Sequence, residues 1–285
     1  ALIGISYYYS GEYDRSYSYL KKSYDIYPFM KEGIQKYALL CDMFKKTREL
    51  EIILRPSSVS PYHYTSEYWF VMATYLYSCL KFEKAQYFIT RVIDHYQNKN
   101  VDALILNAKI LHGNKKSFEA LKSLRDALKF EPHRFEAHRW TIEILLATDK
   151  VKDAQNHATK ALKLLGESPR TLTLAASTYL RNPIAKEKAK PLLQKALEMN
   201  EFYAKAVFFL AQILVDDKDS KAAIKLLEKT TATTTNLKIN LMLADLYAKS
   251  KNLSSALEQY TKVLNVDSTN RHALNGLMAL GSATS

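Results

Sequence analysis

The sequence predicts an all-α fold, an α-solenoid of about eight helical hairpins that stack into a right-handed superhelix. Three observations lead to this prediction. Small residues return at fixed spacings along most of the chain. Glycine and proline number only 7 each among 285 residues, which is too few for a turn-rich β fold. Apolar residues make up 47% of the sequence, enough to bury a continuous core between stacked helices.

Alanine marks the period of the repeat. Markers lie 35, 34, 35, 34 and 33 residues apart, at Ala85, Ala120, Ala154, Ala189, Ala223 and Ala256. Other alanines lie twelve residues before a marker or seven residues after one, at Ala73, Ala108, Ala211 and Ala244, and at Ala127, Ala161 and Ala196. A period of about 34 residues with these spacings resembles the tetratricopeptide repeat, in which two antiparallel helices are joined by a turn.

The spacing has a packing reason. In a tetratricopeptide register these alanines fall at positions 8, 20 and 27 of the repeat. Position 8 lies on the first helix and position 20 on the second, and a large side chain at either would push the two axes beyond the usual 8–10 Å. Position 27 is small because the first helix of the next repeat packs there. Pro132 falls at position 32, where a proline ends the second helix.

This register divides the chain into parts. Residues 1–65 are predicted to form partial and degenerate repeats, and the first begins in mid-repeat, so we expect an upstream part of the solenoid. Two prolines and three serines make the segment from Arg55 onward loop-like. β-branched residues in 230–236 are expected to fray the end of a helix. Six regular repeats follow one another from residue 66, and a capping helix ends the chain, at 66–100, 101–134, 135–169, 170–203, 204–236, 237–270 and 271–285.

Charge and cysteine content limit the class of protein. The chain carries 41 basic and 29 acidic residues, a formal charge of +12, which could favour nucleic acid or an anionic membrane. The basic residues are dispersed, so we expect lysine-covered helix surfaces and no nucleic-acid partner. The longest apolar uncharged run, residues 68–80, is too short to span a bilayer, and no membrane partner is expected. Cys41 and Cys79 have no partner motif, which favours an intracellular setting.

The sequence shows no pattern for catalysis or for a cofactor. Seven scattered glycines build no phosphate-binding loop. The most metal-like stretch is HRFEAH, but His133 and His138 are five residues apart and do not converge on one zinc ion as an i, i+4 pair would. We expect solvent-facing histidines there, and solvated charges at Asp216 and Asp217. No enzyme activity, metal or cofactor is therefore predicted.

Tyrosine is concentrated near the beginning of the chain, with eight between residues 7 and 27. These rings could stack on bases or form a protein interface. In the repeat register Tyr7 takes a core position and Tyr13 lies beside the turn, so we expect most of them to pack between helices. Tyr8 and Tyr19 remain as candidates for an interface.

The first helices of stacked repeats line a concave face, which is the predicted place for partner contacts. The pattern of a carboxylate clamp for peptide tails would need lysine, asparagine and arginine at set positions, and the chain has Ile105, Trp140, Thr171 and Ala175 at such places. The predicted concave face carries mixed side chains instead, either for contact with a partner or as a solvated wall. The candidates are Lys109, Arg139, Glu143, Thr178, Phe208, Gln212, Lys238 and Asp245.

Part of the chain resembles a narrower family. Residues 145–174, 170–207 and 243–270 are similar to the subunit 7 family of the anaphase-promoting complex, also called the cyclosome. The most specific features are the TLTL start at 171–174, the turn NPIAKEKAK at 182–190 and LLQKAL at 192–197. The resemblance covers about residues 101–270, whereas the tyrosine-rich start and the 31–65 repeat depart from the pattern.

This resemblance implies a non-catalytic scaffold in a large E3 ubiquitin ligase of the cell cycle, found in nucleus and cytoplasm. It also implies stacking on other tetratricopeptide subunits, among them one like cell-division-cycle 27, and a homodimer in the full-length protein. Two alternatives remain open from the residues alone. One is a free-standing adaptor that binds a partner peptide in the concave groove, and the other is RNA binding through the basic surface.

Overall fold

The computed structural model describes residues 1–28, 30–55, 65–180, 185–233 and 236–284. The predicted loop at 56–64 lies outside this part, as do two residues of the 230–236 segment. The chain forms two compact units, Ala1–Lys150 and Val151–Ser285, and their boundary falls within the predicted repeat 135–169. Every described element is a helix of 8–15 residues, and no described helix combines the length and apolar character needed to cross a membrane.

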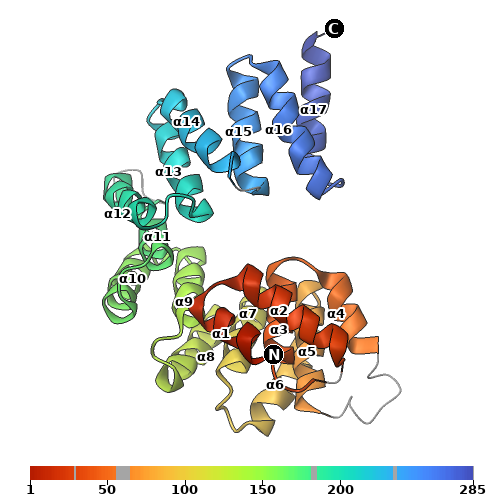
Figure 1. The fold of residues 1–285 in the computed structure, drawn as a ribbon. Coiled ribbons are helices and arrows are strands. Elements are labelled where there is room, and N and C mark those ends of the chain that lie inside the picture. Colours follow the sequence, from red (N-terminus) through yellow and green to blue (C-terminus); the bar gives the residue numbers. More distant parts are fainter. Residues whose placement is uncertain (29, 56–64, 181–184, 234–235, 285) are drawn as a thin grey trace. The chain divides into compact units, whose positions relative to one another are not determined.

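Unit 1 contains nine helices among its described residues (Figure 1). Within it, each helix packs on the next, and α3 also packs on α5 and α7 on α9. The helices are α1 Leu2–Ser10, α2 Tyr13–Ile26, α3 Ile34–Met43, α4 Thr47–Leu54, α5 Ser66–Ser78, α6 Phe82–His95, α7 Val101–Gly113, α8 Ser117–Phe130 and α9 Phe135–Ala147.

Unit 2 is built in the same way from its described residues (Figure 1). Successive helices pack in pairs, and every second helix also contacts the next but one, as α11 does with α13. This paired packing confirms the predicted α-solenoid of helical hairpins. The helices are α10 Val151–Leu165, α11 Pro169–Ser177, α12 Lys186–Met199, α13 Ala204–Asp216, α14 Ser220–Thr231, α15 Leu237–Lys249, α16 Leu253–Val266 and α17 Arg271–Thr284.

The marked alanines lie where helices approach one another. All thirteen are at most 3% exposed, whereas Pro132 is exposed in the turn between α8 and α9. The first hairpin uses glycine for the same purpose. A Cβ added to Gly4 would lie only 2.6 Å from Leu20 Cγ, and the Ser16 hydroxyl donates a 2.7 Å hydrogen bond to the Gly4 carbonyl. Small residues therefore set the distance between α1 and α2.

The turns within the hairpins of unit 1 have one residue in the left-handed region. Gly11 takes this position in the first hairpin with φ 83°, and Lys45, Leu80 and Lys115 take it in the next three with φ of 59–63°. In the α5–α6 turn, the backbone N–H of Leu80 donates to the Tyr77 carbonyl, which closes the last turn of α5. An L-residue in this conformation is disfavoured by roughly 1–2 kcal/mol, so packing of the two helices holds the turn.

Candidate functional site

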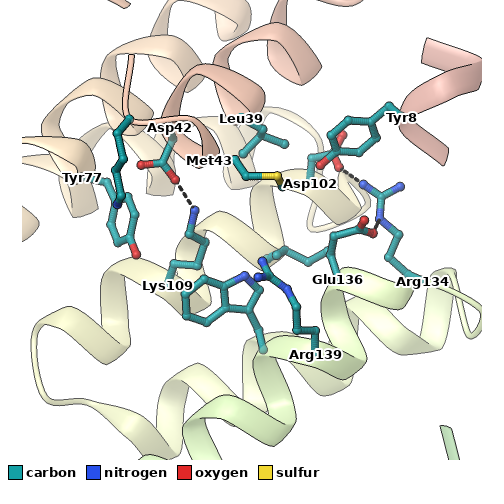
Figure 2. Close-up of a pocket in the computed structure, with 13 residues that line it drawn as sticks. Tyr8, Leu39, Asp42, Met43, Tyr77, Asp102, Lys109, Arg134, Glu136 and Arg139 are labelled. Carbon is teal, nitrogen blue, oxygen red and sulfur yellow. Dashed lines mark hydrogen bonds and ion pairs between the residues drawn. The ribbon is translucent and has the colours of Figure 1, made fainter. Parts of the chain in front are cut away.

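A polar pocket lies on the face of unit 1 formed by the first helices of its hairpins, and Figure 2 shows the residues that line it. Its cavity volume is about 210 Å³. The lining comes from α1, α3, α5, α7 and α9, and from the turns after α3 and before α9. Side chains far apart in the sequence meet here because helices of successive hairpins turn the same face inward.

A buried ion pair forms one end of the pocket. Lys109 Nζ on α7 lies 2.6 Å from Asp42 Oδ2 on α3, and both side chains are less than a tenth exposed (Figure 2). Asp42 also accepts a 2.7 Å hydrogen bond from the Ser78 hydroxyl. Lys109 Nζ lies over two rings, 4.5 Å from the centre of Tyr77 and 5.4 Å from that of Trp140. Burial lowers the pKa of Lys109, which Asp42 opposes and the nearby cations Arg139 and Lys45 reinforce.

A second ionic cluster forms the other end. Arg134 Nη2 lies 2.5 Å from Asp102 Oδ1, and Arg134 Nε lies 2.9 Å from Glu136 Oε2 (Figure 2). Lys36 Nζ lies 2.5 Å from the other oxygen of Asp102. Arg134 is only 4% exposed. Burial lowers its pKa, but the carboxylates of Asp102 and Glu136 outweigh this and raise it, so the guanidinium stays charged.

Three tyrosines of the first hairpin hold this cluster, and we call their contacts the tyrosine latch. The Arg134 guanidinium lies 5.3 Å from the ring centre of Tyr8 and 4.8 Å from that of Tyr9. The Tyr13 hydroxyl at the start of α2 donates a hydrogen bond to Glu136 Oε1. Tyr8, Tyr9 and Tyr13 therefore connect the first hairpin to α9 through side chains.

The two remaining cations of the pocket are less well paired. The Arg139 guanidinium lies 5.2 Å from the ring centre of Trp140, and its nearest carboxylate oxygen, on Glu143, is 3.7 Å away. Lys45 is exposed in the α3–α4 turn and has no ion pair among the described residues. Positive charge is therefore in excess at the Lys109 end, whereas Asp102 and Glu136 neutralise the Arg134 end.

The structure brings three of the eight predicted concave-face residues together, since Lys109, Arg139 and Glu143 lie at this pocket or beside it. The other five belong to unit 2. Thr178 is fully buried and its hydroxyl donates to the Ala175 carbonyl, so it cannot contact a partner and that prediction is wrong. The remaining four are the exposed Gln212 and Lys238, the half-buried Phe208, and Asp245, which accepts a hydrogen bond from the Tyr260 hydroxyl and pairs with His272.

The HRFEAH stretch needs a correction. His133 is exposed as expected, but His138 is buried, and its Nε2 lies 2.8 Å from the Pro132 carbonyl, to which it donates. Burial lowers the pKa of His138, so the neutral ring fits this place. The residues of the stretch that line the pocket are Arg134 and Glu136, between the two histidines. Among the described residues, no group of three potential ligands is placed to hold a metal ion.

The tyrosine predictions also change. Tyr8 is 3% exposed and so belongs to the core rather than to an interface, while Tyr7 is only half-buried. Tyr19 remains exposed and stacks on Tyr7 with ring centres 5.5 Å apart. Sequence reasoning missed Asp42, Asp102, Arg134 and Glu136 altogether. The sequence shows each of them only as a charged residue near one end of an expected helix, Asp42 near the end of α3 and the other three near the starts of α7 and α9.

The sequence was compared with models of protein families and with known proteins. Models of the tetratricopeptide repeat match residues 186–235 and 237–270. Anaphase-promoting complex subunit 7 of Homo sapiens is 28% identical over 254 residues, which cover 89% of this chain and 44% of that protein. The Arabidopsis thaliana subunit 7 is 25% identical over 174 residues, covering 61% of this chain and 30% of that protein. The chain thus spans less than half the length of these relatives.

Two solved structures show the same fold. The APC/C hetero-tetramer Cut9-Hcn1 aligns with a TM-score of 0.61 and 14% identity, covering 94% of this chain and 52% of that one. TTC0263, a tetratricopeptide protein of Thermus thermophilus, aligns with a TM-score of 0.52 and 20% identity, covering 65% of this chain and 99% of that one. With the paired helices and buried alanines, these matches show a fold of stacked helical hairpins, in which residues 186–235 and 237–270 match the tetratricopeptide repeat and 254 residues are similar to subunit 7 of the anaphase-promoting complex.

Proposed function

We propose that this chain is a non-catalytic scaffold of an anaphase-promoting-complex type E3 ubiquitin ligase, where it holds other subunits in place. The observation that supports this most is the similarity to subunit 7, which extends over 89% of the chain. Its partners would be other tetratricopeptide subunits, including one like cell-division-cycle 27, and a second copy in the full-length protein. Its place would be the nucleus and cytoplasm.

Exposed apolar side chains support a stacking role. The first hairpin exposes Leu2, Ile3 and Ile26 by 71%, 58% and 85%. In unit 2, α17 exposes Leu274 and Met278 on one helical face. Large apolar side chains in contiguous patches are typical of surfaces that bind another protein, and a helical hairpin is the shape that stacks on such helices.

Pairwise binding tests the scaffold proposal. The chain is mixed with a purified cell-division-cycle 27 type subunit and followed by analytical ultracentrifugation. We expect a complex, and we expect Met278→Lys or Ile3→Lys to weaken it while circular dichroism stays unchanged. Lys152 is exposed, so Lys152→Glu serves as a control for the effect of a charge change at the surface. Absence of any complex with a folded chain would contradict the proposal.

A second candidate is the free-standing adaptor, and the polar pocket of unit 1 favours it. In that case a peptide would bind along the first helices, and the chain would act without a ligase. Arg139→Ala would then abolish peptide binding at unchanged helicity. If complex formation with other subunits survives this substitution, the scaffold proposal stands.

A further inference from the structure

Helix α17 packs on the rest of unit 2 through one side. Its contacts are with α16 and α15. Ala273 and Leu280 are buried on this side, in one cluster with Tyr260 of α16. A Cβ added to Gly276 would overlap the Tyr260 ring, so the two helices approach closely there. The preceding hairpin therefore covers this side of α17.

A second apolar strip runs along α17 beside the covered side. Leu274 and Met278 lie one helical turn apart on it and are 37% and 72% exposed. A solenoid is normally capped by an element with a polar outer face, which keeps the protein soluble. Here two large apolar side chains lie on the outer face instead, which is typical of a surface that another protein covers. We call this surface the Leu274–Met278 strip.

The repeat register shows which element covers the same strip in other hairpins. Met278 lies 34 residues after Ala244 and therefore takes position 8 of a repeat. At this position Ala244 of α15 is buried in one cluster with Ala256 of α16. Ala211 of α13 is buried in the same way with Ala223 of α14. Position 8 thus faces the second helix of its own hairpin, so the strip on α17 faces the place that an antiparallel second helix takes elsewhere.

The other hairpins also show what kind of helix fits this place. Their second helices carry a small residue at the contact and leucine one turn later, as Ala120 and Leu124 do in α8. Met278 is larger than the alanine of other repeats, so the residue facing it must be small if the axes are to stay 8–10 Å apart. The covering helix is therefore amphipathic, with alanine, glycine or serine opposite Met278 and larger apolar residues on either side.

Charge favours the antiparallel orientation. α17 begins with Arg271 and His272 and contains no acidic residue. His272 already pairs with Asp245 of α15, whereas Arg271 is exposed. An antiparallel helix places its C-terminal end, which carries a partial negative charge, next to Arg271. Acidic residues near that end would add to the attraction.

We propose that the Leu274–Met278 strip binds an amphipathic helix of a partner protein, which lies antiparallel to α17 and completes a hairpin with it. The inference rests on the scaffold proposal for the nature of the partner, a further subunit of the assembly. It deepens that proposal by naming the surface on this chain and the type of helix that the partner supplies.

Methionine methyl signals provide a direct test. The chain has six methionines, and ¹H–¹³C NMR of the methyl-labelled 285-residue chain follows each of them. The α17 signal is assigned with Met278→Leu. Met199 on α12 is also exposed, by 52%, and serves as the internal control for binding elsewhere.

The probe is a synthetic peptide with the sequence of residues 116–131, which contains α8 with Ala120 and Leu124. Isolated helices of this length are marginally stable, so a hydrocarbon cross-link joins positions 125 and 129, which are exposed in α8. We expect a saturable shift of the Met278 signal in the high micromolar range and none at Met199. A peptide with Ala120→Leu should bind about tenfold more weakly, because two large side chains then meet.

Substitutions in the chain are compared by fluorescence anisotropy of the labelled peptide. Met278→Lys should weaken binding about tenfold, since burial of an apolar side chain is lost, and Met199→Lys should leave it unchanged. No saturable shift at Met278, equal binding of the Ala120→Leu peptide, or full affinity in Met278→Lys would overturn the proposal. A Met278 shift on raising the chain concentration without peptide would also overturn it, because a second copy would then cover the strip.

The scaffold proposal is tested separately. A chain that binds the peptide at Met278 but forms no complex with a cell-division-cycle 27 type subunit would contradict the scaffold proposal alone. A complex that forms with that subunit while no peptide binds at Met278 would contradict only the helix-binding proposal.

Discussion

The Tyr13 hydroxyl donates a hydrogen bond to the Glu136 carboxylate, which joins α2 to α9 across 123 positions of the sequence. Glu136 also pairs with the buried Arg134, whose guanidinium lies over the rings of Tyr8 and Tyr9. Most contacts in a solenoid join neighbouring repeats. The tyrosine latch joins distant ones, so it couples the stability of the first hairpin to that of α9.

Removing the latch hydroxyl tests this coupling. Tyr13→Phe should lower the free energy of unfolding by about 1.5–3 kcal/mol, because a hydrogen bond to a charged group is lost and Glu136 keeps its charge. Urea denaturation measures the change. Tyr19→Phe is the matched control, since the Tyr19 side chain is exposed and its substitution should change little. Equal midpoints for the two variants would mean that the latch does not stabilise the fold.

Lys109 and Asp42 should behave as a pair. Lys109→Met alone should lower the free energy of unfolding by about 3–5 kcal/mol, because Asp42 is left charged and buried without its partner. The double variant Lys109→Met with Asp42→Asn should recover much of that loss, since no buried charge remains at this pair. A double-mutant cycle by chemical denaturation gives the coupling. Simple addition of the two single effects would contradict a coupled pair.

The lowered pKa of Glu49 on α4 predicts how the stability of unit 1 changes in acid. Burial alone would raise its pKa, but hydroxyl donors from Tyr17 and Tyr37, with Lys21 beside them, lower it overall. A carboxyl group whose pKa is lower in the folded than in the unfolded state stabilises the folded protein at pH values above its unfolded pKa, about 4.3. This stabilisation is lost as the pH falls through the folded pKa. Glu49→Gln should remove this part of the pH dependence, measured as denaturation midpoints between about pH 6 and about pH 3. An unchanged slope would contradict the assignment.

The α5–α6 turn offers a stabilising change. Leu80 is 73% exposed and has a φ of 59°. Leu80→Gly should raise the free energy of unfolding by about 1 kcal/mol, because glycine adopts this conformation without steric cost. Lys84→Gly, inside α6, should lower it by about the same amount. Thermal unfolding followed by circular dichroism measures both. If Leu80→Gly also lowers the free energy of unfolding, the contacts of the leucine side chain contribute more than the relief of the left-handed backbone conformation.

Much of the fold can be predicted from the sequence because the repeat is local. The distances from Ala108 to Ala120 and Ala127 are fixed by helix geometry and turn length, and all three alanines are buried. The repeat register predicts an interface position for Tyr8, and this prediction is wrong. The register describes contacts within and between neighbouring repeats, so it contains no information about the contact of the first hairpin with α9. Register alone also placed Thr178 on the concave face, whereas it lies buried at the end of α11.

The candidate site was less predictable for a physical reason. Its key pairs, such as Asp42 with Lys109 and Asp102 with Arg134, join residues 67 and 32 positions apart. Each residue alone looks like an ordinary charge on a helix or beside one. In HRFEAH the histidines drew attention to metal binding, yet the buried charges are Arg134 and Glu136. Only the packing of first helices against each other reveals that these charges share one pocket.

Affinity purification followed by quantitative mass spectrometry tests the central claim most directly. The chain is tagged in its own dividing cells and captured from mitotic extracts, beside a Gly4→Leu variant that cannot close its first hairpin because of Leu20. The scaffold account predicts that subunits of a ubiquitin ligase, above all other tetratricopeptide subunits, are enriched with the native chain in near-constant ratios and reduced with the variant. Capture of a folded native chain without any ligase subunit would contradict it.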